Sequence, residues 1–311
     1  MWAGAASLAL LCILPWVVGA YVVQTAIAVL IQSIAVIGLG LLTGFAGRIS
    51  LAQGALVGVG AYTAALLATR LGVPPWFGLP AAIGMACLVG TVLGAPAIRL
   101  SGLYFVMSTI AIEEIVTIVL MHWTALTGGP QGVRGIPALS FGSLSLDSPG
   151  RLYYATLAGA AVSYFLARRL IASRFGLFLR AVSDDELASA TSGVAVLRTK
   201  VAALALSSAW AGAAGFLHAY DIRFVHPDMY TLDLSVVLLT MAIFGGERSL
   251  GGMLVSTAVL GSASEYLRPF GEFRMVAYGV LLLGSMMFFR TGLFARLPSL
   301  LRGGRRLLRR A

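Results

Sequence analysis

Long apolar runs follow one another along most of this chain, and short polar stretches separate them. A run of roughly 18 or more apolar residues with few charges is long enough to cross the hydrocarbon core of a membrane as an α-helix. The sequence therefore predicts an all-α polytopic membrane protein with about ten transmembrane helices. The predicted spans lie at about 5–20, 23–43, 54–71, 79–98, 103–122, 152–171, 201–219, 231–246, 252–267 and 275–290.

The N-terminal apolar run is long enough for two crossings. It ends at Arg48, the first charged residue in the chain. A single helix over the 47 preceding residues would be about 70 Å long, whereas the hydrocarbon core is about 30 Å thick. We therefore predict a turn near residues 19–24. A signal peptide would begin with basic residues, which this N-terminus lacks, so both crossings are expected in the mature protein.

Composition supports the membrane assignment. Hydrophobic residues make up 59% of the chain and charged residues 11%, against about 25% charged residues in soluble domains. The net charge of +10 does not indicate nucleic-acid binding, because the arginines lie between apolar runs and at the C-terminus. The two cysteines, Cys12 and Cys87, lie within apolar runs, so neither a disulfide framework nor a metal site is expected.

The distribution of basic residues predicts the orientation of the helices. All but six of the 22 Lys and Arg residues fall on one side if both termini are cytoplasmic, as the positive-inside rule requires. The six on the other side are Arg70, Arg134, Arg151, Arg223, Arg268 and Arg274. Residues 172–200 then form a long internal loop and residues 123–151 a long external loop. A transmembrane domain, 1–290, precedes a basic cytoplasmic tail, 291–311, which is expected to contact anionic headgroups.

Glycine spacing points to close packing and to one irregular segment. Pairs of glycines four residues apart, such as Gly90 and Gly94, predict close helix–helix contacts. The segment from Gly44 to Gly60 is different, because Arg48 and other polar residues interrupt it. Its backbone is predicted to bend or to lie re-entrant where it borders a polar path.

The internal loop contains a short polar helix, predicted over residues 183–193. Ser183 is a suitable N-cap, and Glu186 three residues later would complete a capping box. Asp184 and Asp185 fill the first turn, where the helix dipole favours negative charge, and Gly193 would end the helix. Such a helix is marginal in water on its own. Two interpretations stay open: an ordinary solvated loop helix, or a docking element for a soluble partner.

Five segments, in order, resemble the LivM-like permease subunits of branched-chain amino-acid ABC transporters. They are GFAGRISLAQGALVGVGAYTAALL, LSGLYFVMSTIAIEEI, TGGPQGVRGIP, SRFGLFLRAVSDDELASATSGVAVLRTKVAALALSSAWAGAAG and FGGERSLGG. The resemblance runs over about residues 25–290. Three places depart from the family pattern: Glu113 stands where a small or apolar residue is usual, Gln53 where His is common, and Glu247-Arg248 where Leu-Gly is frequent.

The resemblance implies a transport subunit in a bacterial-type inner membrane. Its implied partners are a second, LivH-like permease, two ATP-binding cassette subunits, an extracytoplasmic binding protein and the lipid bilayer. The polar helix would be the coupling helix, which sits in a groove of an ATPase subunit. The implied ATPase-coupling residues are Arg180, Ser183, Asp184, Asp185, Glu186, Ala190, Gly193, Arg198 and Lys200.

The remaining candidate residues concern the path of the solute. The expected pathway residues are Ser50, Gln53, Gly54, Tyr62, Tyr104, Thr109 and Glu114, and those expected at an external gate or binding-protein contact are Thr127, Gly128, Gly129 and Pro130. Glu113 and Glu114 are adjacent in a predicted span, so they point about 100° apart and cannot both face one cavity. Glu114 is preferred because it matches the acidic position of the family.

The sequence is consistent with two classes of transporter. The first is the importer permease for branched-chain amino acids or similar small amphipathic solutes. Because the sequence lacks a G-x-x-x-x-G-K-[ST] motif and its single lysine is Lys200, ATP and Mg²⁺ are expected on partner subunits, and this chain is not expected to be an enzyme. The alternative is a self-contained secondary transporter that uses Glu113 and Glu114 for ion coupling.

Overall fold

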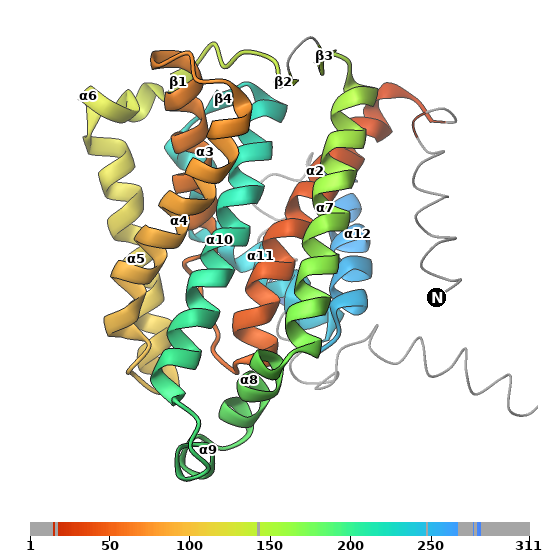
Figure 1. The fold of residues 1–311 in the computed structure, drawn as a ribbon. Coiled ribbons are helices and arrows are strands. Elements are labelled where there is room, and N and C mark those ends of the chain that lie inside the picture. Colours follow the sequence, from red (N-terminus) through yellow and green to blue (C-terminus); the bar gives the residue numbers. More distant parts are fainter. Residues whose placement is uncertain are drawn as a thin grey trace, which may run out of the picture.

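The computed structural model describes residues 18–141, 144–246 and 248–266, together with single residues at 15, 276, 279 and 280. Within these ranges the chain forms a bundle of helices that run along a common direction (Figure 1). Short strands and turns lie at one end of the bundle, and two short helices, α8 and α9, lie at the opposite end. The basic tail predicted at 291–311 lies outside the described residues.

Eight longer helices build the described part of the bundle. They are α2 (Ala20–Gly40), α3 (Gln53–Arg70), α4 (Pro75–Ala97), α5 (Leu103–His122), α7 (Pro149–Ala172), α10 (Val196–Ile222), α11 (Leu232–Gly245) and α12 (Leu250–Tyr266). The shorter elements are η1 (Leu41–Phe45), α6 (Thr124–Thr127), η2 (Gly129–Gln131), α8 (Arg174–Asp184), α9 (Glu186–Thr191), η3 (Pro227–Tyr230) and the strands β1 (Val133–Arg134), β2 (Ser140–Phe141), β3 (Leu144–Ser145) and β4 (Phe224–Val225).

The predicted spans agree with these helices. Each of the eight spans predicted between residues 23 and 267 coincides with a helix, and the span predicted at 103–122 has the same bounds as α5. Five helical segments are long and apolar enough to cross a membrane, namely Ala20–Phe45, Pro75–Ala97, Leu103–His122, Val196–Ile222 and Pro227–Gly245. The helical membrane architecture is thus confirmed. The spans at 5–20 and 275–290 lie outside the described residues, so the count of ten stays a prediction.

Helix α10 forms the centre of the bundle, where it packs against α2, α3 and α4. Its contact with α4 is close because α4 presents small residues there. A Cβ at Gly90 would lie 2.1 Å from Ser208 Oγ, and one at Gly94 would lie 2.4 Å from a methyl group of Leu204. The close packing predicted for this glycine pair is therefore confirmed.

The chain leaves the helical path between α2 and α3. Helix α2 continues into the π-helical segment η1, and residues 46–52 then run without helical structure to the start of α3. The bend predicted between Gly44 and Gly60 is thus present. Gln53, the first residue of α3, donates to Ala35 O at 3.0 Å. Because Ala35 lies ten residues before Phe45, α3 starts about 15 Å inside the bundle, close to half the hydrocarbon thickness.

The opposite end of the bundle is closed by the loop after α5. Strand β1 pairs antiparallel with β4, which follows α10, and places Arg134 beside Phe224. The guanidinium of Arg134 lies 5.3 Å from the centre of the Phe224 ring. Strands β2 and β3 form a short hairpin in the same loop. These contacts tie the loop predicted to be external to the end of the central helix.

Candidate functional site

Both main-chain and side-chain hydrogen bonds hold the non-helical segment at residues 46–52, which is largely buried. Arg48 N donates to Leu42 O at 3.1 Å, and Leu51 N donates to Thr109 Oγ1 of α5 at 3.0 Å. Ser50 Oγ accepts from Ala52 N at 3.4 Å. Irregular backbone at membrane depth is tolerated only where protein groups or a polar cavity satisfy it. Thr109 and Ser50, both predicted pathway residues, thus support the break between α2 and α3.

The N-terminus of α3 is capped by side chains from two other helices. Glu113 Oε2 of α5 accepts hydrogen bonds from Ala55 N at 3.1 Å and from Ser235 Oγ of α11 at 3.0 Å. Ser235 Oγ in turn accepts from Gly54 N at 2.7 Å. These N–H groups lie in the first turn of α3, where no partner exists within the helix, and the carboxyl lies at the positive end of the helix dipole. Glu113 Oε1 is buried and has no hydrogen-bond partner among the described residues.

Gln53 and Tyr62, two further predicted pathway residues, are buried in the bundle. Gln53 Oε1 accepts from Ser207 Oγ at 3.1 Å, so its amide joins α2, α3 and α10. The Tyr62 ring packs edge-on against Tyr230 with ring centres 6.5 Å apart. Both side chains are at most 2% exposed. In this conformation they contact protein, and their role in the pathway stays a prediction.

Helix α5 has one buried face and one exposed face. Glu113 is 1% exposed, whereas Glu114 is exposed on the other face. The expected divergence of the two carboxylates is confirmed. Met107, Ala111, Glu114 and Ile118 follow at spacings of three or four residues and form a continuous exposed strip, the α5 strip. Tyr104, near the start of the same helix, is 72% exposed.

The polar helix of the internal loop differs from its prediction. Helix α8 continues through Ser183 to Asp184, so Ser183 is not the N-cap and the capping box is wrong. The cap is Asp185, whose Oδ1 accepts from Leu187 N at 2.8 Å and Ala188 N at 3.0 Å. The C-terminal prediction is confirmed. Gly193, at φ +84°, follows the C-cap of α9, and its N–H donates to the carbonyl of Ala190.

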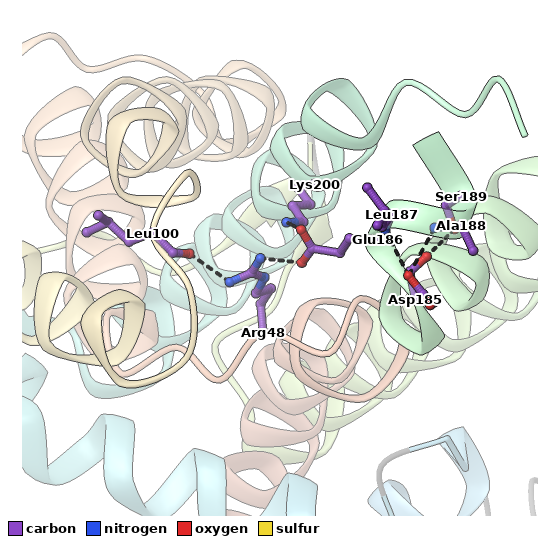
Figure 2. Close-up of polar contacts among 8 residues, drawn as sticks. All are labelled: Arg48, Leu100, Asp185, Glu186, Leu187, Ala188, Ser189 and Lys200. Atoms are coloured by element: carbon purple, nitrogen blue, oxygen red, sulfur yellow. Dashed lines mark hydrogen bonds and ion pairs between the residues drawn. The ribbon is translucent and has the colours of Figure 1, made fainter. Parts of the chain in front are cut away.

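Glu186 pairs with two buried cations instead of capping the helix. Its Oε1 lies 2.5 Å from Arg48 Nη2 and its Oε2 lies 2.5 Å from Lys200 Nζ. Figure 2 shows Arg48 extended between Glu186 and Leu100, whose carbonyl accepts from Arg48 Nη1 at 2.7 Å. Partial burial raises the pKa of the Glu186 carboxyl, but the Lys200 hydrogen bond and the Arg48 charge outweigh this, and the net pKa is below its usual value. The group therefore stays ionised at neutral pH.

Other predicted coupling residues lie on α8, on α9 or near the start of α10. Asp184 pairs with Arg248, from the loop between α11 and α12, at 2.6 Å. The guanidinium of Arg180 lies 5.7 Å from the centre of the Phe45 ring at the end of η1. Ala190 and Arg198 are exposed. The structure thus gathers the polar helix, the end of η1 and the start of α10 at one end of the bundle.

The predicted gate residues form a compact turn at the other end. Thr127 Oγ1 donates to Leu120 O at 2.7 Å and accepts from Gly129 N at 3.1 Å. Gly128 and Gly129 have φ of +77° and +58°, a conformation that favours glycine. Pro130 is exposed, whereas Thr127 and Gly129 are buried. Three of the four residues therefore shape the turn.

Several residues of these clusters were not assigned by sequence reasoning. They are Arg48, Ser207, Ser235 and Arg248. Each bonds to a residue at least 64 positions away in the sequence. Arg48 carried one signal, because it is the first charge after a long apolar run. Within the described ranges, no three His, Cys, Asp or Glu side chains are grouped so that they could hold a metal ion.

Comparison with known proteins assigns the family. The chain matches the family of the branched-chain amino acid transport system permease component over residues 21–290. It is 32% identical to the high-affinity branched-chain amino acid transport system permease protein LivM of Escherichia coli, over 90% of this chain and 71% of that protein. The LivM protein of Salmonella typhimurium is 30% identical over the same shares. A probable branched-chain amino acid transport permease protein LivH of Methanocaldococcus jannaschii is 26% identical over 70% of each chain.

No solved structure matches the chain. The family match nevertheless covers all of α2 except its first residue and every later helix through α12, and it includes both the break before α3 and the polar helices α8 and α9. The apolar spans and the two LivM proteins agree with this assignment. The chain is a multi-pass membrane protein that belongs to the family of branched-chain amino acid transport permease components.

Proposed function

We propose that this chain is one permease subunit of an ABC importer for branched-chain amino acids or similar small amphipathic solutes. The family and its two LivM relatives, which are branched-chain amino acid transport permeases, support this class of solute. Residues 1–290 would form the permease domain in a bacterial inner membrane, with both termini in the cytoplasm. An extracytoplasmic binding protein would deliver the solute. ATP and Mg²⁺ would bind to separate ATPase subunits.

The observation that carries the proposal is the pair of short helices at one end of the bundle. Helix α9 is capped at both ends, and its Glu186 is fixed by ion pairs. Leu187, the next residue, is 77% exposed, so most of its apolar side chain is not buried in the bundle. A capped helix that presents an exposed leucine suits insertion into a groove of another protein. We assign that groove to an ATPase subunit.

The second proposed partner is a LivH-like permease that covers the outer face of α5. Placing a charged side chain at the centre of a helix in lipid costs about 2.5–3.5 kcal/mol. Glu114 lies mid-way along α5 in the otherwise apolar α5 strip, so contact with a protein or a polar path is favoured over contact with lipid. Similarity to both LivM and LivH proteins supports a pair of homologous permeases.

The solute pathway would follow this interface. Glu114 and Tyr104 would face it directly, because both are exposed on α5. The buried pathway residues Ser50, Gln53, Gly54, Tyr62 and Thr109 would shape the broken segment behind it. At the outer end, the turn at 127–130 would contact the binding protein through Pro130. Labelling of cysteines placed at positions 50, 53 and 57 tests whether this segment reaches water.

The ion-coupled alternative has less support. It needs carboxylates that act together on one path, whereas Glu113 caps α3 inside the bundle and Glu114 lies on the opposite face. The family assignment favours the importer as well.

The direct test is purification of the chain from its native membrane in mild detergent, followed by mass spectrometry of the proteins that stay bound. Two ATPase chains and a second permease are expected. Ligand binding by the associated binding protein would then identify the solute. Recovery of the chain alone, or as a homo-oligomer with ion-driven uptake, would contradict the proposal.

A further inference from the structure

Three contacts join the polar helices α8 and α9 to the chain that leaves η1. The guanidinium of Arg180 lies over the Phe45 ring, and Glu186 pairs with Arg48. Between them, a Cβ at Gly47 would lie 2.7 Å from Ser183 Oγ, so the two backbones approach closely. Gly47 has a φ of +66°, which allows the chain to turn there. Residues 45–48 therefore follow the surface of α8 and the start of α9.

The pair between Arg48 and Glu186 is the strongest of these contacts. The Arg48 side chain is 8% exposed and also holds Leu100 O, so its guanidinium is fixed at two points. Lys200, 6% exposed, shares the same carboxylate. Removing the carboxylate would leave two buried cations without a counter-charge, which is strongly unfavourable. A displacement of α9 is therefore expected to carry Arg48 with it.

A short segment connects Arg48 to the centre of the bundle. Only residues 49–52 separate it from Gln53, the start of α3, and five extended residues span up to about 17 Å. The segment is fixed along its course by the hydrogen bond from Leu51 N to Thr109. At its inner end lie Gly54 and Ala55, which Ser235 and Glu113 cap. One continuous stretch thus runs from the polar end of the bundle to its mid-depth.

We propose that the Arg48–Glu186 pair is the linkage that transmits movement of α9 to the start of α3. Arg48 and Glu186 are positioning residues, because they act on the broken segment and not on the solute. This inference rests on the proposed docking of an ATPase subunit at α9. ATP-driven movement of α9 pulls residues 47–52 through Arg48, and the start of α3 follows. The cap by Glu113 places α5, with Glu114 on its other face, at the end of this route.

The test uses the complete transporter, with its ATPase subunits, second permease and binding protein, in proteoliposomes. ATP hydrolysis and solute uptake are measured for the unsubstituted complex and for Glu186→Gln. We expect the ATPase subunits to remain bound and to hydrolyse ATP, while solute moved per ATP falls about tenfold, a usual size for coupling between two sites. An unchanged ratio of uptake to hydrolysis would overturn the linkage.

Asp147→Asn is the matched control. It removes another exposed ion pair, the one with Arg223, in which both side chains are about half exposed or more. Asp147 lies between β3 and α7, away from the polar helices α8 and α9, and its substitution leaves Arg48 and Glu186 in place. Uptake per ATP should therefore not change. If Asp147→Asn uncouples as strongly as Glu186→Gln, the effect does not come from the Arg48–Glu186 pair and the specific linkage is wrong.

A labelling experiment separates transmission from a loss of fold. Cysteine is placed at Ile49, next to Arg48, in a chain with Cys12→Ser and Cys87→Ser, and its reaction rate with a thiol reagent is measured with and without ATP. The rate should change with ATP, and the change should be lost when Glu186→Gln is added although hydrolysis persists. A change that persists, or that never occurs, overturns the linkage. If Glu186→Gln does not accumulate, Arg48→Lys replaces it, since lysine keeps the charge but lacks the planar fork that joins Leu100 and Glu186.

The outcomes also separate this inference from the proposed function. If the unsubstituted chain purifies without ATPase subunits, the proposed function fails. If those subunits are bound and drive uptake, but Glu186→Gln transports normally, only the linkage fails.

Discussion

Glu113 and Glu114 are neighbours in the sequence of α5 but lie on different faces of the helix, one buried and one exposed. The Glu113 carboxyl is buried and accepts hydrogen bonds from Ala55 N and Ser235 Oγ, whereas Glu114 lies exposed among the apolar residues of the α5 strip. A turn of about 100° per residue produces this divergence. One carboxyl therefore belongs to the internal structure, and the other is available to a partner or a solute.

The first prediction concerns the cap at the start of α3. Glu113→Ala removes the acceptor for Ala55 N and leaves a buried donor unpaired, which costs about 1–3 kcal/mol. The thermal unfolding midpoint of the purified protein should fall. Glu113→Gln keeps an acceptor oxygen and should recover part of the loss. A Glu113→Ala protein as stable as the parent would show that α3 does not depend on this cap.

The second prediction concerns the exposed neighbour. Glu114→Gln leaves the internal hydrogen bonds intact, so expression and the unfolding midpoint should not change. If the carboxylate meets the amino group of the solute, the KM of uptake should rise about tenfold, equivalent to about 1.4 kcal/mol. Uptake by the reconstituted transporter measures this.

Glu114→Asp is the control for that substitution, because it keeps the charge and shortens the side chain by one methylene group. It should restore most of the uptake. Normal uptake by Glu114→Gln would remove Glu114 from the pathway.

Much of the fold could be predicted because its signals are local. The length and hydropathy of a run decide whether it can span a membrane, and residues 103–122 accordingly form α5 with the predicted bounds. Gly193 could be predicted as a helix end because a φ of +84° is accessible to glycine without strain. Its hydrogen bond to the carbonyl of Ala190 depends on residues within one turn.

The candidate site could not be predicted in the same way, because its contacts are distant in sequence. Glu186 was expected to complete a capping box with Ser183, but its partner Arg48 lies 138 residues away. Ser183 instead lies within α8, where it packs beside Gly47. The N-cap of α9 is therefore Asp185. The amide of Gln53 donates to the carbonyl of Ala35, 18 residues away, a contact that the sequence around Gln53 does not indicate. Tertiary partners thus decided the role of each polar side chain.

The third prediction tests α9 as the docking element. Leu187→Asp changes a side chain that is 77% exposed, so the permease itself should fold normally. If Leu187 inserts into an ATPase groove, the substitution should weaken binding by about 2 kcal/mol, roughly thirtyfold in Kd. The amount of ATPase subunit recovered with the purified permease measures this loss.

Leu71→Asp is the matched control for Leu187→Asp. Leu71 is 70% exposed and lies just after α3, at the end of the bundle opposite to α9. Its substitution should leave ATPase recovery unchanged. Equal recovery with Leu187→Asp would show that the exposed leucine of α9 is not part of the interface.

The fourth prediction concerns pH. Because the folded-state pKa of Glu186 is lowered, its ion pairs with Arg48 and Lys200 contribute their full stability above the ordinary carboxyl pKa of about 4.3, and this contribution is lost as pH falls through the lower folded-state value. Between pH 7 and pH 5, the difference in unfolding midpoint between the parent and Glu186→Gln should therefore stay constant, and it should shrink below about pH 4.

The Glu186 side chain is 49% exposed, so added salt should also reduce the difference. Leu71→Ala serves as the control, because it removes no titratable group, leaves Glu186 and both of its cations in place, and should keep the parent's pH profile. A difference that already declines between pH 7 and pH 5 would assign the stabilisation to another group.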